Sequence, residues 1–190
     1  LRALRDRRQL ESLSAPHIKF NKELVAEFVK GLPFFLTDDQ RIATYEILKD
    51  LERDYPMNRL LNGDVGSGKT VVALISAYQV AKAGYQVVFL APTEILAKQH
   101  FKSISKLLEG FDVALGFLTS KESKIFKSKE IFDVSKKSLL EDLKNGQIDI
   151  LIGTHSLIKK GVEFKGLALV VVDEQHRFGV DQRMALVRGQ

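Results

Sequence analysis

From residue 59 onward, short apolar runs alternate with longer segments in which apolar residues recur at helical spacing. Apolar runs of this length are typical of buried parallel strands, and they predict strands at 59–62, 87–91, 113–118, 148–152 and 167–172. The helical spacing predicts helices at 71–83, 94–108 and 139–144, each followed by a glycine that can end it. Strands separated by helices predict an α/β fold, a mostly parallel sheet covered by helices on both faces.

The first part of the chain shows helical patterns only. A charged stretch covers the first eleven residues, and Leu24, Val25 and Phe28 continue at helical spacing until Gly31. Thr37 is a suitable N-cap for a further helix that carries apolar residues from 42 to 51. We therefore expect 1–31 to be a helical linker from a preceding domain and 32–190 to be the main domain, incomplete at its C-terminal end. Residues 119–137 are rich in Lys and Ser, are weakly periodic and predict no definite element.

Composition excludes several classes of protein. The longest apolar run has six residues, far below the roughly 18 that a membrane span needs. The absence of cysteine excludes disulfides and thiol catalysis. The net charge of +5 is concentrated in 1–31, with seven basic and four acidic groups, and in 117–147, with seven and five. So small an excess fits solvated helices at least as well as a nucleic-acid surface. Because the first residue is Leu1 and no signal peptide is visible, we interpret the chain as a piece of a longer intracellular protein.

A phosphate-binding pattern follows the first predicted strand and opens the next predicted helix. Its G-x-x-x-x-G-K-[ST] residues are Gly63, Asp64, Val65, Gly66, Ser67, Gly68, Lys69 and Thr70. In such a loop, backbone amides and the helix N-terminus bind phosphate oxygens. Lys69 would reach the β- and γ-phosphates, and the Thr70 hydroxyl would bind Mg²⁺. The carboxylate of Asp64 must point away from a triphosphate because like charges repel.

The most apolar predicted strand, 167–172, ends in two carboxylates, Asp173 and Glu174. In phosphate-loop enzymes an aspartate in this place holds Mg²⁺, here through water, and Glu174 would activate the attacking water as general base. A strand that ends in a polar turn would explain the pair alone. The phosphate loop upstream makes the functional interpretation stronger, because ligands gather at the carboxyl ends of parallel strands.

The carboxylates begin a DExH box formed by Asp173, Glu174, Gln175 and His176, which resembles that of superfamily 2 helicases and translocases. The box and its continuation to Val180 are similar to the RecG family of branch-migrating DNA helicases, with transcription-repair coupling translocases as near relatives. The same resemblance is carried by segments at 32–40, 56–61, 91–97 and 152–155. It covers roughly residues 32–190 and implies the first RecA-like motor domain of such an enzyme.

The resemblance also implies roles for individual residues. Gln40 would read the adenine base, and Gln175 and His176 would couple the nucleotide state to a later motif. Contacts to the DNA backbone would come from three strand ends, with Pro92, Thr93 and Glu94 at the first, Thr119 and Ser120 at the second, and Gly153, Thr154 and His155 at the third. The second of these lacks a glycine that relatives carry between Thr119 and Ser120, which puts its backbone contact in doubt. His17 and His100 have no supporting residues around them and receive no role.

Together these features predict an ATP- and Mg²⁺-dependent DNA helicase that remodels branched or forked duplex DNA, such as stalled forks and Holliday junctions, in recombination and repair. The resemblance implies a second RecA-like lobe and an N-terminal wedge domain in the same protein, no membrane partner, a monomer, and a bacterial cytoplasmic, nucleoid-associated location. We expect these 190 residues alone to hydrolyse little ATP, because an arginine from the other lobe is needed. The alternatives are a transcription-repair coupling translocase and a phosphate-loop nucleotide switch that does not bind DNA.

Overall fold

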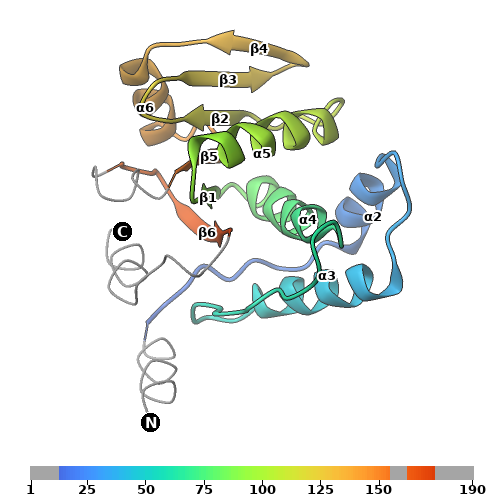
Figure 1. The fold of residues 1–190 in the computed structure, drawn as a ribbon. Coiled ribbons are helices and arrows are strands. Elements are labelled where there is room, and N and C mark those ends of the chain that lie inside the picture. Colours follow the sequence, from blue (N-terminus) through green and yellow to red (C-terminus); the bar gives the residue numbers. More distant parts are fainter. Residues whose placement is uncertain (1–12, 155–161, 174–190) are drawn as a thin grey trace. The chain divides into compact units, whose positions relative to one another are not determined.

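The computed structural model describes residues 13–154 and 162–173. The chain divides into two compact units between Gln79 and Val80, a point that lies within helix α4 (Lys69–Lys82). The elements of both units are labelled in Figure 1. Among the described residues, no helix is both long and apolar enough to cross a membrane.

The first unit is helical in its described part and contains α2 (Lys22–Lys30) and α3 (Asp38–Asp50) before α4. Helix α2 begins because the Asn21 side chain accepts a hydrogen bond from the backbone N–H of Leu24, and it ends at Gly31, as predicted. Phe28 on α2 is fully buried, and its ring stacks on that of Tyr78 with the ring centres 4.3 Å apart. This stacked pair anchors α2 within the unit.

The predicted strand at 59–62 is wrong, because these residues form no strand in the structure. Arg59 instead forms ion pairs with Asp50 at 2.7 Å and Glu46 at 2.6 Å, and Leu60 is 71% exposed. A strand exists only when a neighbouring strand supplies hydrogen bonds. In this unit the described elements are all helices, so two adjacent leucines have no strand to pair with.

The second unit contains a six-stranded sheet in the order β4-β3-β2-β5-β1-β6. The strands are β1 (Gln86–Ala91), β2 (Leu115–Leu118), β3 (Ser123–Lys127), β4 (Glu130–Asp133), β5 (Ile150–Thr154) and β6 (Leu167–Val172). Strands β2, β5, β1 and β6 are parallel, whereas β3 and β4 pair antiparallel at one edge. The predictions of strands at 87–91, 113–118, 148–152 and 167–172 are confirmed to within two residues at each end.

Helices α5 (Glu94–Leu107) and α6 (Lys136–Lys144) lie on opposite faces of this sheet. Phe101 of α5 contacts Phe117 of β2, with ring centres 5.0 Å apart. Leu139 of α6 packs in a cluster with Leu118, the next residue along β2. Since neighbouring residues of a strand point to opposite faces, the two helices cover different sides. The predicted fold class, an α/β domain with a mostly parallel, helix-covered sheet, is confirmed.

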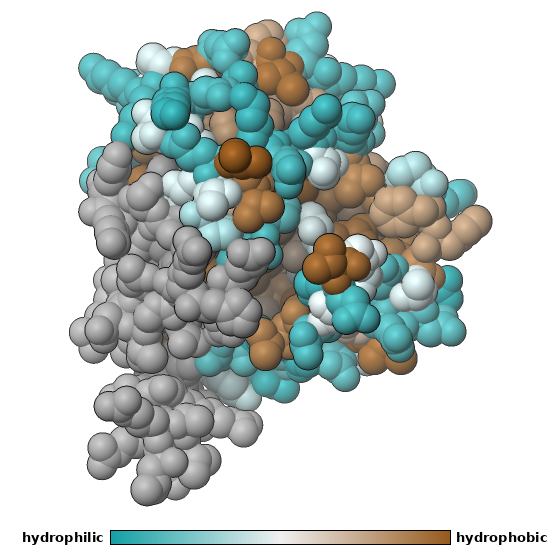
Figure 2. Space-filling model, viewed as in Figure 1, coloured by the Kyte–Doolittle hydropathy of each residue, from teal (hydrophilic) through white to brown (hydrophobic). Residues whose placement is uncertain are grey.

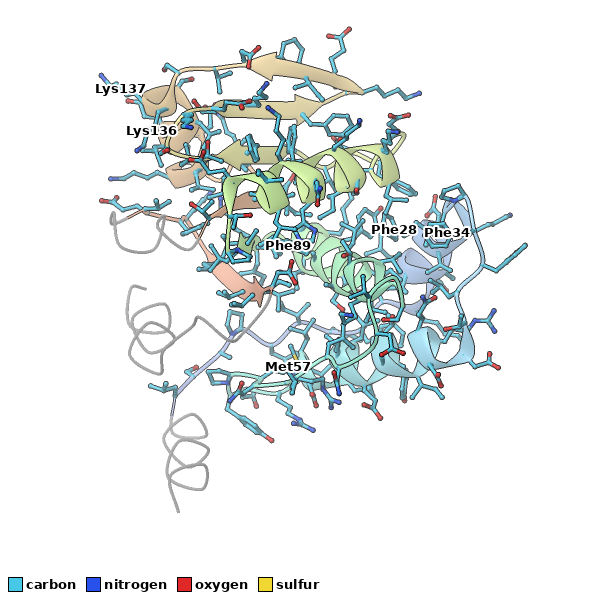
Figure 3. All side chains as sticks on the ribbon, in the orientation of Figure 1. Phe28, Phe34, Met57, Phe89, Lys136 and Lys137 are labelled. Carbon is cyan, nitrogen blue, oxygen red and sulfur yellow. The ribbon has the colours of Figure 1, made fainter. Side chains whose placement is uncertain are left out.

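The hairpin of β3 and β4 was not predicted. Its two-residue turn consists of Ser128 and Lys129, whose φ angles of 54° and 69° are those of a type I′ turn. Lys136 and Lys137 follow at the exposed start of α6, where Figure 3 labels them. The basic excess of residues 117–147 therefore lies on this hairpin and the helix after it.

On the face seen in Figure 2, hydrophobic side chains appear singly or in small groups among hydrophilic ones. Large apolar side chains that are more than half exposed include Phe35, Ile42, Tyr45 and Ile95. Apolar residues scattered in this way are ordinary for a protein surface.

Candidate functional site

The phosphate-binding pattern forms a tight loop at the start of α4. Gly66 and Gly68 have φ angles of 84° and 81°, a conformation that favours glycine, and the Ser67 N–H donates to the Asp64 carbonyl at 3.1 Å. Helix α4 begins directly after them at Lys69. The loop thus has the curled backbone and the adjoining helix N-terminus that anion binding requires.

Lys69 points back onto this loop. Its Nζ donates hydrogen bonds to the carbonyl oxygens of Gly63 at 2.6 Å and Asp64 at 2.8 Å. The side chains of Asp64 and Val65 are exposed to solvent. The ammonium group is therefore held at the loop itself, where a phosphate could exchange for the two carbonyls.

Gln40 connects the start of α3 to the same loop. Its Oε1 accepts a hydrogen bond from the Thr37 N–H at 2.9 Å, and its Nε2 donates to the Ser67 carbonyl at 2.8 Å. The Thr37 side chain in turn accepts from the Gln40 N–H, which completes a capping box and confirms Thr37 as the N-cap. Gly68 has a φ of 81°, which disfavours any residue with a side chain, and an alanine Cβ there would also displace the Gln40 amide, whose Nε2 would lie 2.3 Å away. Both ends of the amide already have partners, and the adenine-reading role stays a prediction.

In the second unit, those predicted DNA-contacting residues that the structure describes gather on the side of the sheet where the parallel strands end. Strands β1, β2, β5 and β6 all end there because they are parallel. The register pairs Ala91 with Thr154 and Leu118 with Gly153. The loops that begin at Pro92 and Thr119 therefore leave the sheet beside the end of β5. Ligands of open α/β sheets bind at these carboxyl ends of the strands.

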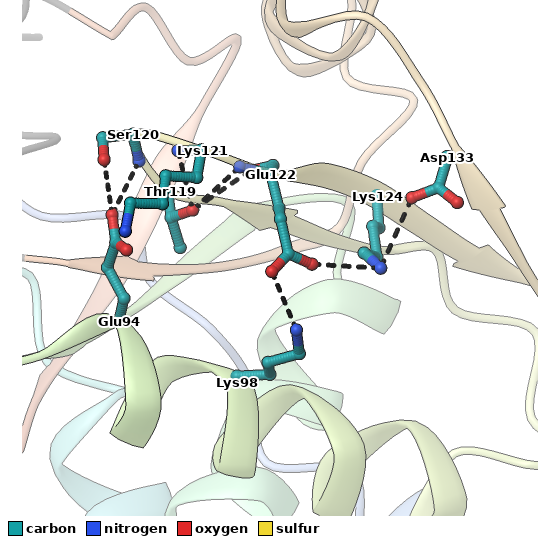
Figure 4. Close-up of polar contacts among 8 residues, drawn as sticks. All are labelled: Glu94, Lys98, Thr119, Ser120, Lys121, Glu122, Lys124 and Asp133. Carbon is teal, nitrogen blue, oxygen red and sulfur yellow. Dashed lines mark hydrogen bonds and ion pairs between the residues drawn. The ribbon is translucent and has the colours of Figure 1, made fainter.

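Two of these strand ends are joined by hydrogen bonds, drawn in Figure 4. Thr93 is the N-cap of α5, and its side chain accepts from the Leu96 N–H at 3.2 Å. The next residue, Glu94, accepts from the Ser120 hydroxyl at 2.5 Å and from the Ser120 N–H at 3.2 Å. The hydroxyl bond is the main cause that lowers the pKa of Glu94, so this carboxylate stays charged.

The turn at 119–122 is closed by the Thr119 hydroxyl oxygen, which accepts from the N–H groups of Lys121 at 3.2 Å and Glu122 at 3.1 Å. The positive-φ residues other than glycine in the described chain are Ser128 and Lys129 only, so Ser120 adopts no left-handed conformation. The turn accordingly forms without a glycine between Thr119 and Ser120.

Ion pairs connect this turn to its neighbours (Figure 4). Glu122 lies 2.8 Å from Lys98 on α5 and 3.1 Å from Lys124 on β3, and Lys124 also lies 3.4 Å from Asp133 on β4. Hydrogen bonds from Lys98 and then Lys124 lower the pKa of Glu122. The chain of charges links α5, the turn and the hairpin. Because Lys98 and Asp133 are exposed and the other two groups are only partly buried, we expect these ion pairs to orient the segments rather than to stabilise them strongly.

Asp173 has a partner that the sequence did not indicate. Its Oδ2 lies 2.7 Å from Nε2 of His100 on α5, and its backbone N–H donates to the Leu90 carbonyl at 2.9 Å. The two side chains are 73 residues apart in sequence. Sequence spacing alone places His100 less than two turns into the helix after Thr93, and no pattern predicts which strand end it faces.

A sequence model of the DEAD/DEAH box helicase family matches residues 37–189. The chain belongs to this helicase family. The ATP-dependent DNA helicase RecG of Aquifex aeolicus is 44% identical to it over 187 residues, 98% of this chain. RecG of Bacillus subtilis is 51% identical over 168 residues, 88% of this chain. A structure of RecG bound to a three-way DNA junction matches 92% of this chain with a TM-score of 0.80 and 42% identity.

These findings confirm the resemblance to RecG that the sequence motifs indicated. The chain spans 22% and 23% of the lengths of the two curated relatives, and 23% of the solved chain.

Thr70 and Asp173, the two residues predicted to hold Mg²⁺, each carry an oxygen donor of the kind that this ion prefers. Asp173 has a 39% exposed side chain at a strand end, and Thr70 lies in the first turn of α4. The described residues hold no group of three or more His, Cys, Asp or Glu that could enclose a metal. Mg²⁺ usually keeps several waters and binds one or two protein oxygens plus phosphates, so a small protein contribution suits it.

Four of the predicted site residues, His155, Glu174, Gln175 and His176, lie outside the described residues. The structure describes the predicted linker at 1–31 only from residue 13 onward. Within residues 13–31, α2 is the one helix.

Proposed function

We propose that this chain is the ATP-binding part of the motor of an ATP-dependent DNA helicase that remodels branched DNA in recombination and repair. The observation that carries the proposal is the phosphate loop, in which two left-handed glycines precede a 14-residue helix and the Lys69 ammonium rests on the loop carbonyls. The 44% sequence identity to RecG of Aquifex aeolicus over 98% of the chain supports the choice of a DNA helicase over other phosphate-loop proteins.

In this proposal the phosphates of ATP replace the two carbonyls as partners of Lys69, and Gln40 reads the base. Thr70 and Asp173 would hold Mg²⁺, the latter through water, and Glu174 would take the proton of the attacking water. The bound ion would neutralise charge on the β- and γ-phosphates. Turnover needs an arginine from a second RecA-like lobe, so the 190 residues alone would turn over little ATP.

The strand ends of the second unit would contact the backbone of DNA. Hydroxyl groups and helix N-terminal N–H groups are suitable donors to phosphate, and Thr93 caps the N-terminus of α5. The hydroxyl and N–H of Ser120 donate to Glu94 and would have to exchange this carboxylate for a phosphate. The related RecG structure is bound to a three-way junction. A forked or branched duplex is therefore the substrate we propose, with an N-terminal wedge domain engaging the junction, a monomeric enzyme and the bacterial cytoplasm as its location.

The proposal is tested with Lys69→Ala in the intact protein. The DNA-stimulated ATPase rate should fall at least about 100-fold, and unwinding of forked DNA should be lost, because a phosphate contact is removed. Lys30→Ala, an exposed lysine at the end of α2, is the matched control and should behave as wild type. Unwinding by Lys69→Ala at the wild-type rate would contradict the proposal.

Two measurements separate the alternatives. ATPase activity of the wild-type protein that does not respond to DNA would favour a nucleotide switch. Binding to RNA polymerase, together with DNA-stimulated ATPase activity but no unwinding of forks, would favour a transcription-repair coupling translocase.

A further inference from the structure

His100 and Asp173 form a hydrogen bond that the proposed function does not by itself explain. The distance of 2.7 Å between His100 Nε2 and Asp173 Oδ2 is that of a strong, charge-assisted bond. A carboxylate can only accept, so Nε2 must carry the proton and donate it. The direction of the bond is therefore fixed by chemistry, and His100 holds one particular oxygen of the carboxylate.

Both partners are anchored to the sheet. On α5, Ala97 and Ile104 have no exposed surface and Phe101 is 4% exposed, so the face that carries His100 packs against the strands. The His100 side chain itself is only 20% exposed. The backbone of Asp173 is fixed by the hydrogen bond from its N–H to the Leu90 carbonyl of β1. A donor on a packed helix thus meets an acceptor on a fixed strand end, which leaves the carboxylate little freedom to rotate.

The two oxygens of Asp173 are not equivalent in this arrangement. Oδ2 is occupied by His100, and the structure gives Oδ1 no partner among the described residues. The Asp173 side chain is 39% exposed, so water can reach the carboxylate. A metal-binding carboxylate that is oriented in this way by a second hydrogen bond binds its ion better than one that must be ordered first.

We propose that His100 is a positioning residue for Asp173, which holds Oδ2 so that Oδ1 is directed to a water of the Mg²⁺ ion. This rests on the proposed function, because it assumes that Asp173 serves a nucleotide-bound ion. His100 touches neither nucleotide nor metal in this role and acts through the carboxylate alone.

The test measures metal binding separately from turnover. Mn²⁺ replaces Mg²⁺ in the intact protein with a non-hydrolysable ATP analogue, and its dissociation constant is followed by electron paramagnetic resonance. His100→Leu removes the donor and should raise that constant about 10-fold. His100→Asn, too short to reach Asp173, should do the same. His100→Gln places an amide N–H near the position of Nε2 and should restore binding to within about 3-fold of wild type. Affinity for the analogue without metal should not change.

A variant elsewhere on the same helix controls for altered packing. Lys98 lies two residues before His100 on α5. Lys98→Met breaks the ion pair with Glu122 and leaves the bond between His100 and Asp173 intact. It should bind Mn²⁺ as wild type does. Unchanged Mn²⁺ binding in His100→Leu and His100→Asn would overturn the inference, and so would equal weakening in His100→Gln or Lys98→Met.

The same titration distinguishes this failure from failure of the proposed function. Absence of analogue or Mn²⁺ binding in the wild-type protein would overturn the proposed function, and this inference with it. Normal wild-type binding with unaffected His100 variants would overturn the inference alone.

Discussion

Gln86, at the first position of β1, is 4% exposed and uses its side-chain amide completely. Its Nε2 donates to the carbonyls of Leu143 at 2.8 Å and Ile148 at 2.7 Å, and its Oε1 accepts from the N–H groups of Lys165 at 2.7 Å and Gly166 at 3.1 Å. One side chain thereby joins the end of α6 to the segments that lead into β5 and β6. We predict that Gln86→Leu strongly destabilises this part of the sheet.

The magnitude follows from the four bonds. Each contributes roughly 1 kcal/mol net, and each leaves a backbone group without a partner when it is lost. Leucine regains about 1 kcal/mol by burying apolar surface in place of the amide. The free energy for opening the sheet should therefore fall by about 3 kcal/mol. A glutamate at position 86 should be no better, because its carboxylate would face two carbonyl oxygens.

Native-state hydrogen exchange measures this opening directly in the intact protein. A loss of about 3 kcal/mol should speed exchange of the β1 and β5 amides on the order of 100-fold. Gln147→Leu makes the same chemical change at an exposed position and should leave their exchange unaltered. If Gln86→Leu cost less than about 1 kcal/mol, the reasoning that buried amide bonds hold this end of the sheet together would be refuted.

Two further predictions concern the phosphate loop and one half-buried carboxyl. Gly68→Ala should weaken binding of a fluorescent ATP analogue at least about 10-fold, because the residue is left-handed and its Cβ would meet Gln40; unchanged affinity would contradict this. Burial raises the pKa of Asp149, so the folded protein keeps this proton after the unfolded chain has lost it. Stability from this group must then fall as pH rises from 3.8 through the raised pKa. Asp149→Asn keeps the acceptor oxygen and should flatten thermal stability over that range, whereas a wild-type slope would show that another group is responsible.

The central sheet was predictable because its strands are buried on both faces. All six residues of β1 and all five of β5 are buried, and the apolar runs at 87–91 and 150–152 lack the polar face that an amphipathic helix would show. The starts of two helices depend on equally local sequence, since the Asn21 and Thr37 side chains cap their helices by bonding to residues three positions along the chain. Such features need no information from distant parts of the chain.

The two strands at the side of the sheet, β3 and β4, were not predictable for the opposite reason. Strand β4 is exposed along its whole length, and β3 buries one residue, Phe126, so neither has a hydrophobic pattern to detect. Their pairing depends on the turn at Ser128 and Lys129, which lacks the Asn-Gly or Asp-Gly pair typical of such turns. Conversely, the leucines of 59–62 had the pattern of a strand but no strand to pair with in their unit.

At the candidate site, the sequence identified residue types but not their partners. The glycines and Lys69 form a continuous motif, whereas the bond of Glu94 to Ser120 spans 26 residues and that of His100 to Asp173 spans 73. Both bonds arise because the parallel strands all end on the same side of the sheet. The helix that follows β1 therefore passes close to the ends of the strands beside β1. A histidine without nearby motif residues can therefore act at a distant carboxylate. Partners at this edge are better sought from strand register than from sequence spacing.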